Sequence, residues 1–378
     1  MADESFIASF SKALLSSAYD IHADNVDPYR FPELSRGPGR SLLRAVKNAV
    51  LQLARRTGFV YVDTRDMGEL SQNLGQILYR ADGLGKLYQS LNDEQSQQML
   101  ISVLVFWVLG NRRVKLPRNQ PSYWATVRHI ERDLLLQRRT IPIQVLDGYL
   151  NAYDLHVAGF PIRLHAHVLN ILNTFVLQQY RYSKARKVIQ ARPGDVVIDG
   201  GGCWGDTALY FAYQVQSNGR VICFEFAPGN LAVLQANLEM NPNLSSRVRV
   251  VREALWDRSG ELLRFKDAGP CTTVVRQEDA GLTVPTLAID DLVAKERLES
   301  VDFIKLDVEG AELLALKGAK QTLKQFRSTL AISLYHNLDD FVTIPAFLRE
   351  LEVGYEFYLD HFTIHREETV LFAQSTAG

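Results

Sequence analysis

The sequence predicts an α/β protein in which a doubly wound, mostly parallel sheet follows a mainly helical region. From residue 195 onward, short β-branched runs alternate with helical patterns, and a glycine-rich turn at 200–205 follows the first run. Before residue 145, apolar residues recur mainly at helical spacing. We therefore expect a helical domain at 1–145, a connecting segment with a lid-like helix at 146–190, and an α/β domain at 191–378.

Composition narrows the class of protein. The chain has 378 residues, 47% hydrophobic and 22% charged, which is enough apolar sequence for a sizeable core. A net charge of -1 argues against a nucleic-acid partner. Cys203, Cys223 and Cys271 form no CxxC motif, and the first residues carry no secretory pattern, so we expect a reducing, cytoplasmic location without disulfides or zinc. The most apolar stretch, 99–109, is about half of a membrane span and is interpreted as a buried helix.

Two helices stand out in the first half. Residues 41–56 place leucines and valines at helical spacing before Gly58. A second helix runs from the capping residues Asn92–Glu94 to Leu109, where Gly110 ends it. The other elements expected here are a strand at 59–62, a weaker helix at 72–78, a loop at 112–121, short strands and turns at 144–160, and a helix at 165–180.

The tail of the 165–180 helix lies just before the glycine-rich turn. It contains Tyr180 and Tyr182, for which two roles are open. The tail either folds over a bound ligand as a lid, or its tyrosines pack between domains.

The second half alternates regularly between strands and helices. The strands are expected at 196–198, 221–226, 248–251, 284–289, 301–306 and 330–334, and the helices at 208–213, 228–240, 311–326 and 345–351. A small hairpin is expected around 261–265 and 271–275. The runs 355–359 and 369–372 have no helix between them, which predicts an antiparallel pair closing the sheet. Ligands of such folds bind beyond the carboxyl ends of the strands.

The glycine-rich turn indicates a nucleotide-like cofactor. Gly200, Gly202 and Gly205 have the spacing of the dinucleotide fingerprint, which is weak evidence by itself. Asp199 directly precedes the glycines, where a carboxylate could receive the ammonium of S-adenosylmethionine. Glu225 ends the next strand, from which an acid takes ribose hydroxyls. A single nucleotide-binding half is followed by a different strand, which favours S-adenosylmethionine over NAD.

The strand at 301–306 carries the second group of candidate residues. Lys305 lies inside an otherwise apolar strand and needs a partner, for which we expect Asp307. Asp307 is also the candidate for contacting the methyl donor or an acceptor hydroxyl. Glu309 and Glu312 follow. An acid at a helix start complements the helix dipole, so a structural role is favoured for Glu312 over a role in the reaction.

Three histidines follow in the sequence. His336 ends the next strand, where it is either a general base or a core histidine bonded to the backbone. His361 and His365 are candidates for the border of an acceptor pocket. A metal held by Asp307, Glu309 and His336 is conceivable, but their spacing does not demand it and none is expected.

Several sequence blocks resemble the FkbM family of S-adenosylmethionine-dependent methyltransferases. They are DVVIDGGGCWGDTALYFA, VICFEFAPGN, VVREALWD, TLAIDDL, VDFIKLDVEGAELLALKGA and the tail from AISLYHNLDD, over about residues 190–374. The resemblance implies a class I, Rossmann-like sheet of seven mostly parallel strands with an antiparallel C-terminal strand. It also implies O-methylation of sugars or natural-product hydroxyls.

The resemblance also implies roles for individual residues. It assigns Asp199, Gly200 and Gly202 to the cofactor turn, Glu225 to the ribose and Asp307 to the reaction strand. The chain has Asp-Gly-Gly-Gly where the family often has Asp-Val-Gly-Ala, and Phe226 where Pro is usual. The full expected cofactor set is Asp199, Gly200, Gly201, Gly202, Trp204, Thr207, Glu225, Phe226, Glu253, Ala254 and Asp307.

The sequence therefore predicts an O-methyltransferase. Asp307 and His336 are expected near the acceptor, with Lys305 fixing Asp307 or stabilising a developing alkoxide. Expected partners are a small-molecule or glycan acceptor, with no nucleic acid, no membrane span and room for a homo-oligomer. The alternatives are an NAD(P)-dependent oxidoreductase or epimerase, for which the Tyr180-x-x-x-Lys184 spacing lies on the wrong side of the turn, and a non-catalytic nucleoside-binding scaffold.

Overall fold

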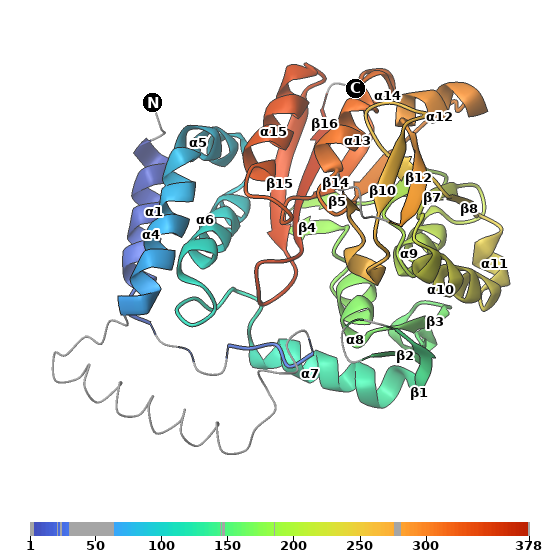
Figure 1. Ribbon diagram of the computed structural model, residues 1–378, viewed down its shortest axis with the longest axis horizontal. Helices are drawn as coiled ribbons and strands as arrows, with labels where there is room; N and C mark the ends of the chain where they lie inside the picture. Colours follow the sequence, from blue (N-terminus) through green and yellow to red (C-terminus); the bar gives the residue numbers. More distant parts are fainter. Residues whose placement is uncertain are drawn as a thin grey trace.

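The structure, a computed structural model, describes residues 4–20, 22, 25–29, 64–143, 145, 148–184, 186–275 and 281–376. A seven-stranded sheet with the order β15-β16-β14-β13-β6-β7-β8 forms its centre (Figure 1). Within this sheet β16 alone runs antiparallel to its neighbours. The strands are β6 (Val196–Gly200), β7 (Arg220–Phe224), β8 (Val248–Val251), β13 (Phe303–Leu306), β14 (Thr329–Ser333), β15 (Tyr355–His361) and β16 (Thr369–Ser375). The expected fold class is confirmed.

Alternating side chains of the central strands enter two separate cores. On one face Ile198 and Ile304 join a core with apolar residues of α12 to α15, and on the other Val197 and Phe303 join a core with α9 and α10. This sorting follows from the two-residue period of a strand, which makes parallel sheets apolar on both faces. The helices are α9 (Asp206–Val215), α10 (Pro228–Glu239), α11 (Pro242–Ser245), α12 (Ile289–Glu296), α13 (Glu312–Lys317), α14 (Lys320–Phe326) and α15 (Asp340–Glu350).

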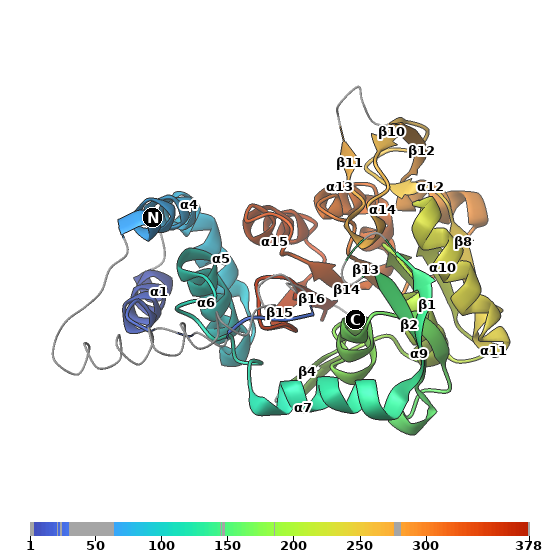
Figure 2. The same ribbon diagram turned by 60° about the horizontal axis from the view of Figure 1, so that its bottom comes forward.

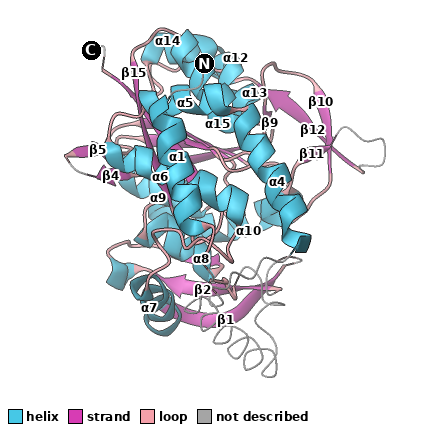
Figure 3. Ribbon diagram, turned by 90° about the vertical axis from the view of Figure 1, so that its left-hand side faces the viewer, coloured by secondary structure: helices cyan, strands magenta, loops and turns pink. Residues whose placement is uncertain are grey.

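The N-terminal helices lie beside the β15 edge of the sheet (Figures 1 and 3). They are α1 (Glu4–Ser17), α4 (Thr64–Tyr79), α5 (Ala81–Ser90) and α6 (Glu94–Leu109). Asn92 N donates to Phe357 O (2.9 Å) and Leu359 N donates to Ser96 Oγ (2.9 Å), so the start of α6 covers this edge. The buried helix expected up to Leu109 is confirmed. The expected helix at 41–56 and strand at 59–62 lie outside the described residues.

The connecting segment contains strands that the sequence analysis did not define. After α7 (Pro121–His129) and a π-helical turn (Ile130–Leu134), an antiparallel sheet forms from β1 (Leu135–Pro142), β2 (Tyr149–Asp154) and β3 (Arg163–Ala166). Figure 1 shows α7 and this sheet together at the lower right, and Figure 2 brings them toward the viewer. The helix expected at 165–180 comprises α8 (Val168–Asn170) and a π-helical segment (Ile171–Val176), followed by β4 (Tyr182–Lys184) and β5 (Lys187–Ile189). β1 pairs with β2 across residue 145. The domain boundary expected at that residue stays a prediction.

A second, smaller sheet with the order β11-β10-β12-β9 lies after β8. Its strands are β9 (Ala254–Leu255), β10 (Leu262–Phe265), β11 (Val274–Val275) and β12 (Leu282–Leu287). A 3-10 turn at Gly269–Cys271 lies between β10 and β11, and another at His156–Ala158 lies between β2 and β3. The hairpin of β10 and β11 is confirmed, and the strand expected at 284–289 belongs to this sheet.

The helix expected at 311–326 is broken into α13 and α14 at Gly318. A Cβ at this position would lie 2.1 Å from Trp256 O, so the chain passes too close to its neighbour for a side chain. In the described part of the chain, no helix combines the length and apolarity that a membrane crossing requires.

Candidate active site

A cavity of about 510 Å³ opens beyond the carboxyl ends of β6, β7, β13 and β14. Its volume lies in the usual range of small-molecule pockets. The expected residues on its wall are Gly201, Trp204, Thr207, Glu225, Phe226, Glu253, Ala254, Lys305, Asp307 and His336. Among the described residues, Asp199, Gly200 and Gly202 lie behind this wall rather than on it. The structure thus gathers most of the predicted site at one edge of the sheet.

The glycine turn packs directly against its neighbours. Gly201 has a φ of +82°, and a Cβ there would lie 1.9 Å from Asp307 O. A Cβ on Gly202 would lie 2.1 Å from Cys223 Sγ. The amides of Gly201 and Gly202 both donate to Phe224 O, over 3.1 and 2.8 Å. Glycine is therefore required for the turn to fit between β7 and β13.

Lys305 pairs with Asp199, so its expected pairing with Asp307 is wrong. Its Nζ lies 3.1 Å from Asp199 Oδ1 and donates to Gly200 O (2.9 Å) and Gly201 O (2.6 Å). Lys305 and Asp199 are direct partners across β13 and β6, which brings their side chains together. Burial lowers the pKa of Lys305, but the charges of Asp199 and Asp307 together raise it above its ordinary value, and the amine stays protonated.

This pairing also revises two expected roles. Asp199 is fully buried and its Oδ2 accepts a hydrogen bond from Thr207 Oγ1 (2.8 Å), so it does not reach the cavity to receive a ligand ammonium. The three hydrogens of Lys305 are directed at Asp199 and the turn carbonyls, which argues against the expected direct stabilisation of an alkoxide by Lys305. Lys305 instead connects β13 to the glycine turn.

Asp206 is an acid on the cavity wall that the site prediction missed. It is the first residue of α9, and its Oδ2 accepts hydrogen bonds from Thr174 Oγ1 (2.7 Å) and Asn170 Nδ2 (3.4 Å). Burial raises its pKa above the ordinary value. An acid in the first turn of a helix is expected for the helix dipole alone, so the position of Asp206 in the sequence does not indicate that it faces a ligand.

Glu225 follows β7 and faces the cavity, as expected from its position. Its Oε1 accepts from Phe226 N (2.6 Å) and Ala227 N (2.7 Å), and its Oε2 from Asn230 Nδ2 (3.1 Å). The residue is 7% exposed, and burial raises the pKa of its carboxyl to about 7. A carboxylate held in this way beside a glycine turn can accept hydrogen bonds from the hydroxyls of a ribose.

Two tyrosine hydroxyls hold the carboxylate of Asp307. Tyr180 Oη donates to Oδ2 and Tyr335 Oη donates to Oδ1, each over 2.9 Å. Burial raises the pKa of Asp307, but the charges of Lys305 and His336 lower it further, and the net pKa lies below the ordinary value. Asp307 is thus a fixed anion on the cavity wall, and neither tyrosine was predicted to hold it.

The tyrosine pair before the glycine turn divides between two functions. Tyr180 contacts the site, whereas Tyr182 Oη donates to Asp93 at the start of α6. Both side chains are buried, which supports packing rather than a movable lid. Lys184 donates to Asp360 (2.7 Å), so Tyr180 and Lys184 do not form the pair expected of an oxidoreductase.

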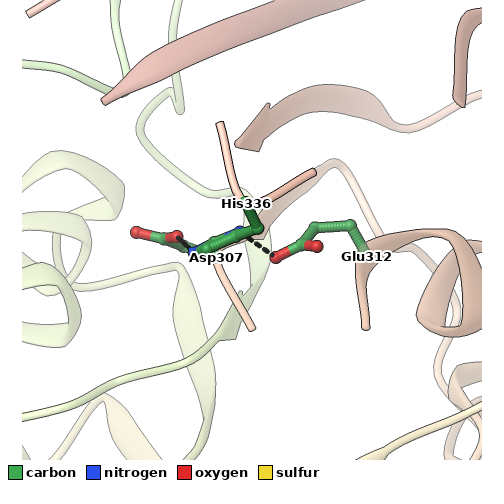
Figure 4. Close-up of side chains that lie close together, drawn as sticks. All are labelled: Asp307, Glu312 and His336. Atoms are coloured by element: carbon green, nitrogen blue, oxygen red, sulfur yellow. Dashed lines mark ion pairs between the residues drawn. The ribbon is translucent and has the colours of Figure 1, made fainter. Parts of the chain in front are cut away.

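His336 lies between carboxylates, which argues against its expected role as a general base. Its Nδ1 is 3.0 Å from Glu312 Oε1, and its Nε2 is 3.4 Å from Glu309 Oε2 and 3.6 Å from Asp307 Oδ1 (Figure 4). Burial lowers the pKa of His336, but Glu309 and Glu312 raise it more, to about 11. At neutral pH the ring is an imidazolium and has no free lone pair to accept a proton.

The same cluster places a possible ligand atom from each of Asp307, Glu312 and His336 within 4.8 Å of the others. The two ring nitrogens of His336, however, face different carboxylates on opposite sides of the ring, as Figure 4 shows for Asp307 and Glu312. This is the arrangement of an imidazolium whose two ring nitrogens are each paired with a carboxylate. Glu312 Oε1 also accepts from Val308 N (2.8 Å), which holds the start of α13.

The other two histidines do not border the cavity, and that expectation is wrong. His361 is fully buried, and its Nδ1 lies 2.8 Å from Thr369 Oγ1. His365 Nε2 accepts from Asp27 N (3.2 Å). The turn between β15 and β16 reaches the cavity instead through residues 366–368.

The strand order, the glycine turn after β6 and the acid after β7 together define a class I methyltransferase fold. Residues 189–357 match the family model of the methyltransferase FkbM domain. This part of the chain is therefore similar to the FkbM methyltransferases, and the match supports S-adenosylmethionine as the cofactor.

Two known proteins illustrate the similarity. The 2-O-methyltransferase NoeI of Sinorhizobium fredii is 28% identical, over 36% of this chain and 62% of NoeI. The crystal structure of methyltransferase FkbM from Methylobacillus flagellatus is 20% identical with a TM-score of 0.50, over 79% of this chain and 60% of that one. The chain thus spans less than two thirds of each, and the second likeness concerns the fold alone.

Proposed function

We propose that the protein transfers the methyl group of S-adenosylmethionine to a hydroxyl of a sugar, a glycan or a natural product. The observation that carries the proposal is the position of Asp307, a fixed anion that shares one cavity with the glycine turn and with Glu225. Cofactor-holding residues and a charged group beyond them therefore face the same space, as a transfer between two bound molecules requires. The name of the relative NoeI, a 2-O-methyltransferase, supports the choice of oxygen as the acceptor.

The residues of the wall suggest how the cofactor is held. The backbone of Gly201 allows close approach, and Glu225 is placed to accept hydrogen bonds from ribose hydroxyls. Asp206 is the acid on the wall beside the turn, so in this proposal it replaces Asp199 as the partner of the ammonium. When bound, S-adenosylmethionine supplies an electrophilic methyl group on a sulfonium. The protein's part is then to align the acceptor oxygen, exclude water and remove a proton.

Other residues of the cavity lining suit a polar acceptor. It includes Asn173, Gln179 and Arg366, which come from the connecting segment and from the β15–β16 turn. Amide and guanidinium groups can donate several hydrogen bonds to a hydroxyl-rich molecule. In this proposal, acceptor specificity therefore depends on residues outside the matched segment 189–357, including those before residue 190.

Calorimetry with S-adenosylmethionine and S-adenosylhomocysteine tests the cofactor site. We expect micromolar binding that Glu225→Ala weakens at least tenfold, whereas Glu239→Ala, on the exposed end of α10, leaves it unchanged. Transfer of a tritiated methyl group to a panel of methyl glycosides tests the acceptor. Binding of neither cofactor form at millimolar concentration by folded protein would contradict the proposal.

A further inference from the structure

Glu309 occupies a strained position at the entrance to α13. Its φ is +54°, and Gly310 follows with a φ of +95°. Two successive residues in the left-handed region turn the chain sharply, and this conformation is unfavourable for any residue with a Cβ. Glu312 Oε1 accepts hydrogen bonds from Val308 N (2.8 Å) and Gly310 N (3.4 Å), which hold the turn in place. Strain of this kind in a non-glycine residue is typical of functional sites.

The turn brings the Glu309 side chain to the cavity wall. The side chain is 28% exposed, and its Oε2 lies 3.4 Å from His336 Nε2. It is separated from Asp307 by one residue, at the same carboxyl end of β13. His336 Nε2 also lies 3.6 Å from Asp307 Oδ1, so the two carboxylates border the same part of the cavity.

The charges around Glu309 give it a different acidity from Asp307. Burial raises the pKa of Glu309 above its ordinary value, helped by Asp307 and Glu312 and opposed by His336, whereas the pKa of Asp307 is lowered. Tyr335 also faces this group from the end of β14. Where two neighbouring carboxylates have their pKa values pushed apart, the one with the higher value is the stronger base.

The neighbouring groups are committed to other contacts. His336 is protonated and Lys305 is held by Asp199 and the glycine turn. Each oxygen of Asp307 already accepts a hydrogen bond from a tyrosine. At the ends of β13 and β14, the described carboxylate that combines a place on the cavity wall with a raised pKa is that of Glu309.

We propose that Glu309 is the general base of the methyl transfer, and that His336 positions its carboxylate. This inference rests on the proposed O-methyltransferase function. An oxygen lone pair of the acceptor forms the new bond to the methyl carbon, and the S–C bond breaks with its electron pair remaining on sulfur. The acceptor O–H proton moves to a Glu309 oxygen, and its bonding pair stays on the acceptor oxygen. The products are the methyl ether and S-adenosylhomocysteine, with the proton released later to water.

The test begins with wild-type protein, tritiated S-adenosylmethionine and methyl glycosides of hexoses, deoxyhexoses and pentoses. Glu309→Gln is expected to lower kcat by about 100-fold or more and to remove the rise of kcat with pH. Its affinity for S-adenosylhomocysteine stays within twofold of wild type. Glu309→Gly frees the turn from strain and leaves room for formate, so added formate restores activity in this variant but not in Glu309→Gln.

A matched control is available in Glu352, an exposed glutamate with a φ of +56°. Glu352→Gly relieves the same backbone strain and is expected to leave both kcat and its pH profile unchanged. Variants of Glu309 that keep kcat within threefold of wild type, with the same pH profile, would overturn the role of Glu309 alone. A wild-type protein that binds S-adenosylhomocysteine but methylates none of the glycosides would overturn the proposed sugar acceptor and, with it, this inference.

Discussion

Tyr180 Oη donates a hydrogen bond to Asp307 Oδ2 over 2.9 Å, joining residues 127 positions apart in the sequence. The contact connects the segment before the glycine turn to the end of β13. Two residues later, Tyr182 Oη donates to Asp93 of the N-terminal helices. The short segment from Tyr180 to Tyr182 therefore links the candidate active site to the helical half of the chain.

This division gives a matched pair of variants. Tyr180→Phe leaves a buried carboxylate with one donor fewer and is expected to cost about 2 kcal/mol of unfolding free energy and about tenfold in kcat. Tyr182→Phe loses a bond to Asp93 and should cost a similar amount of stability, with kcat unchanged. Urea unfolding and methyl-transfer assays measure both effects. Equal losses of kcat in the two variants would contradict the assignment of Tyr180 to the site.

The buried pair of Lys305 and Asp199 is expected to dominate local stability. Lys305→Met leaves Asp199 buried without its counter-charge, which should cost about 3–5 kcal/mol. Adding Asp199→Leu to this variant removes the isolated charge and should recover part of the loss. Lys86→Gln, which breaks an exposed pair with Asp82, serves as a control with an unchanged midpoint in urea. A Lys305→Met protein of wild-type stability would contradict the pairing.

Gly201 is predicted to be more sensitive to substitution than a glycine of similar backbone conformation. Gly260→Ala, at a φ of +85° in open space, should cost about 1 kcal/mol because of the backbone alone. Gly201→Ala, at a φ of +82°, adds a Cβ only 1.9 Å from Asp307 O and should cost more and abolish S-adenosylhomocysteine binding. Thermal unfolding and calorimetry compare the two, and equal effects would argue against close packing of the turn.

Cofactor affinity should depend on pH through Glu225. Its pKa of about 7 means that the carboxyl is neutral below this pH and charged above it. Because ribose hydroxyls donate more strongly to a carboxylate, affinity for S-adenosylhomocysteine should rise between pH 6 and pH 8 and then level off. Glu225→Gln should bind more weakly and lose this dependence. A wild-type affinity that falls over the same range would contradict the role of Glu225.

The imidazolium of His336 can be observed directly. With a pKa of about 11, the ring should show doubly protonated nitrogen shifts in NMR spectra from pH 5 to pH 9. Since this pKa is raised above the ordinary value of about 6.5, His336 stabilises the fold fully below that pH, and its contribution is lost as the pH rises toward 11. His336→Asn should therefore destabilise the protein more at pH 6 than at pH 10. Titration of His336 near pH 6.5 would restore the general-base reading.

Much of the fold was predictable because it follows from local patterns. β-branched runs identified β6, β7, β8, β13 and β14, and the absence of a helix between β15 and β16 predicted their antiparallel pairing. Gly318 shows where local pattern fails, because the break between α13 and α14 falls where the chain passes close to Trp256, which lies on a different segment. The strands β1 and β4 were missed for a related reason: each is short or partly exposed, with a weak alternation of its own.

The candidate site divides in the same way. The sequence alone determined the residue types and their positions at strand ends, from the glycine turn to Glu225 and Asp307. The tertiary structure decided the partners. The register of β13 on β6 paired Lys305 with Asp199. The packing of β14 placed His336 among carboxylates that keep it protonated. Periodicity determines which face a side chain occupies, but ion pairs and pKa values depend on distances between segments, and these exist only in the folded chain.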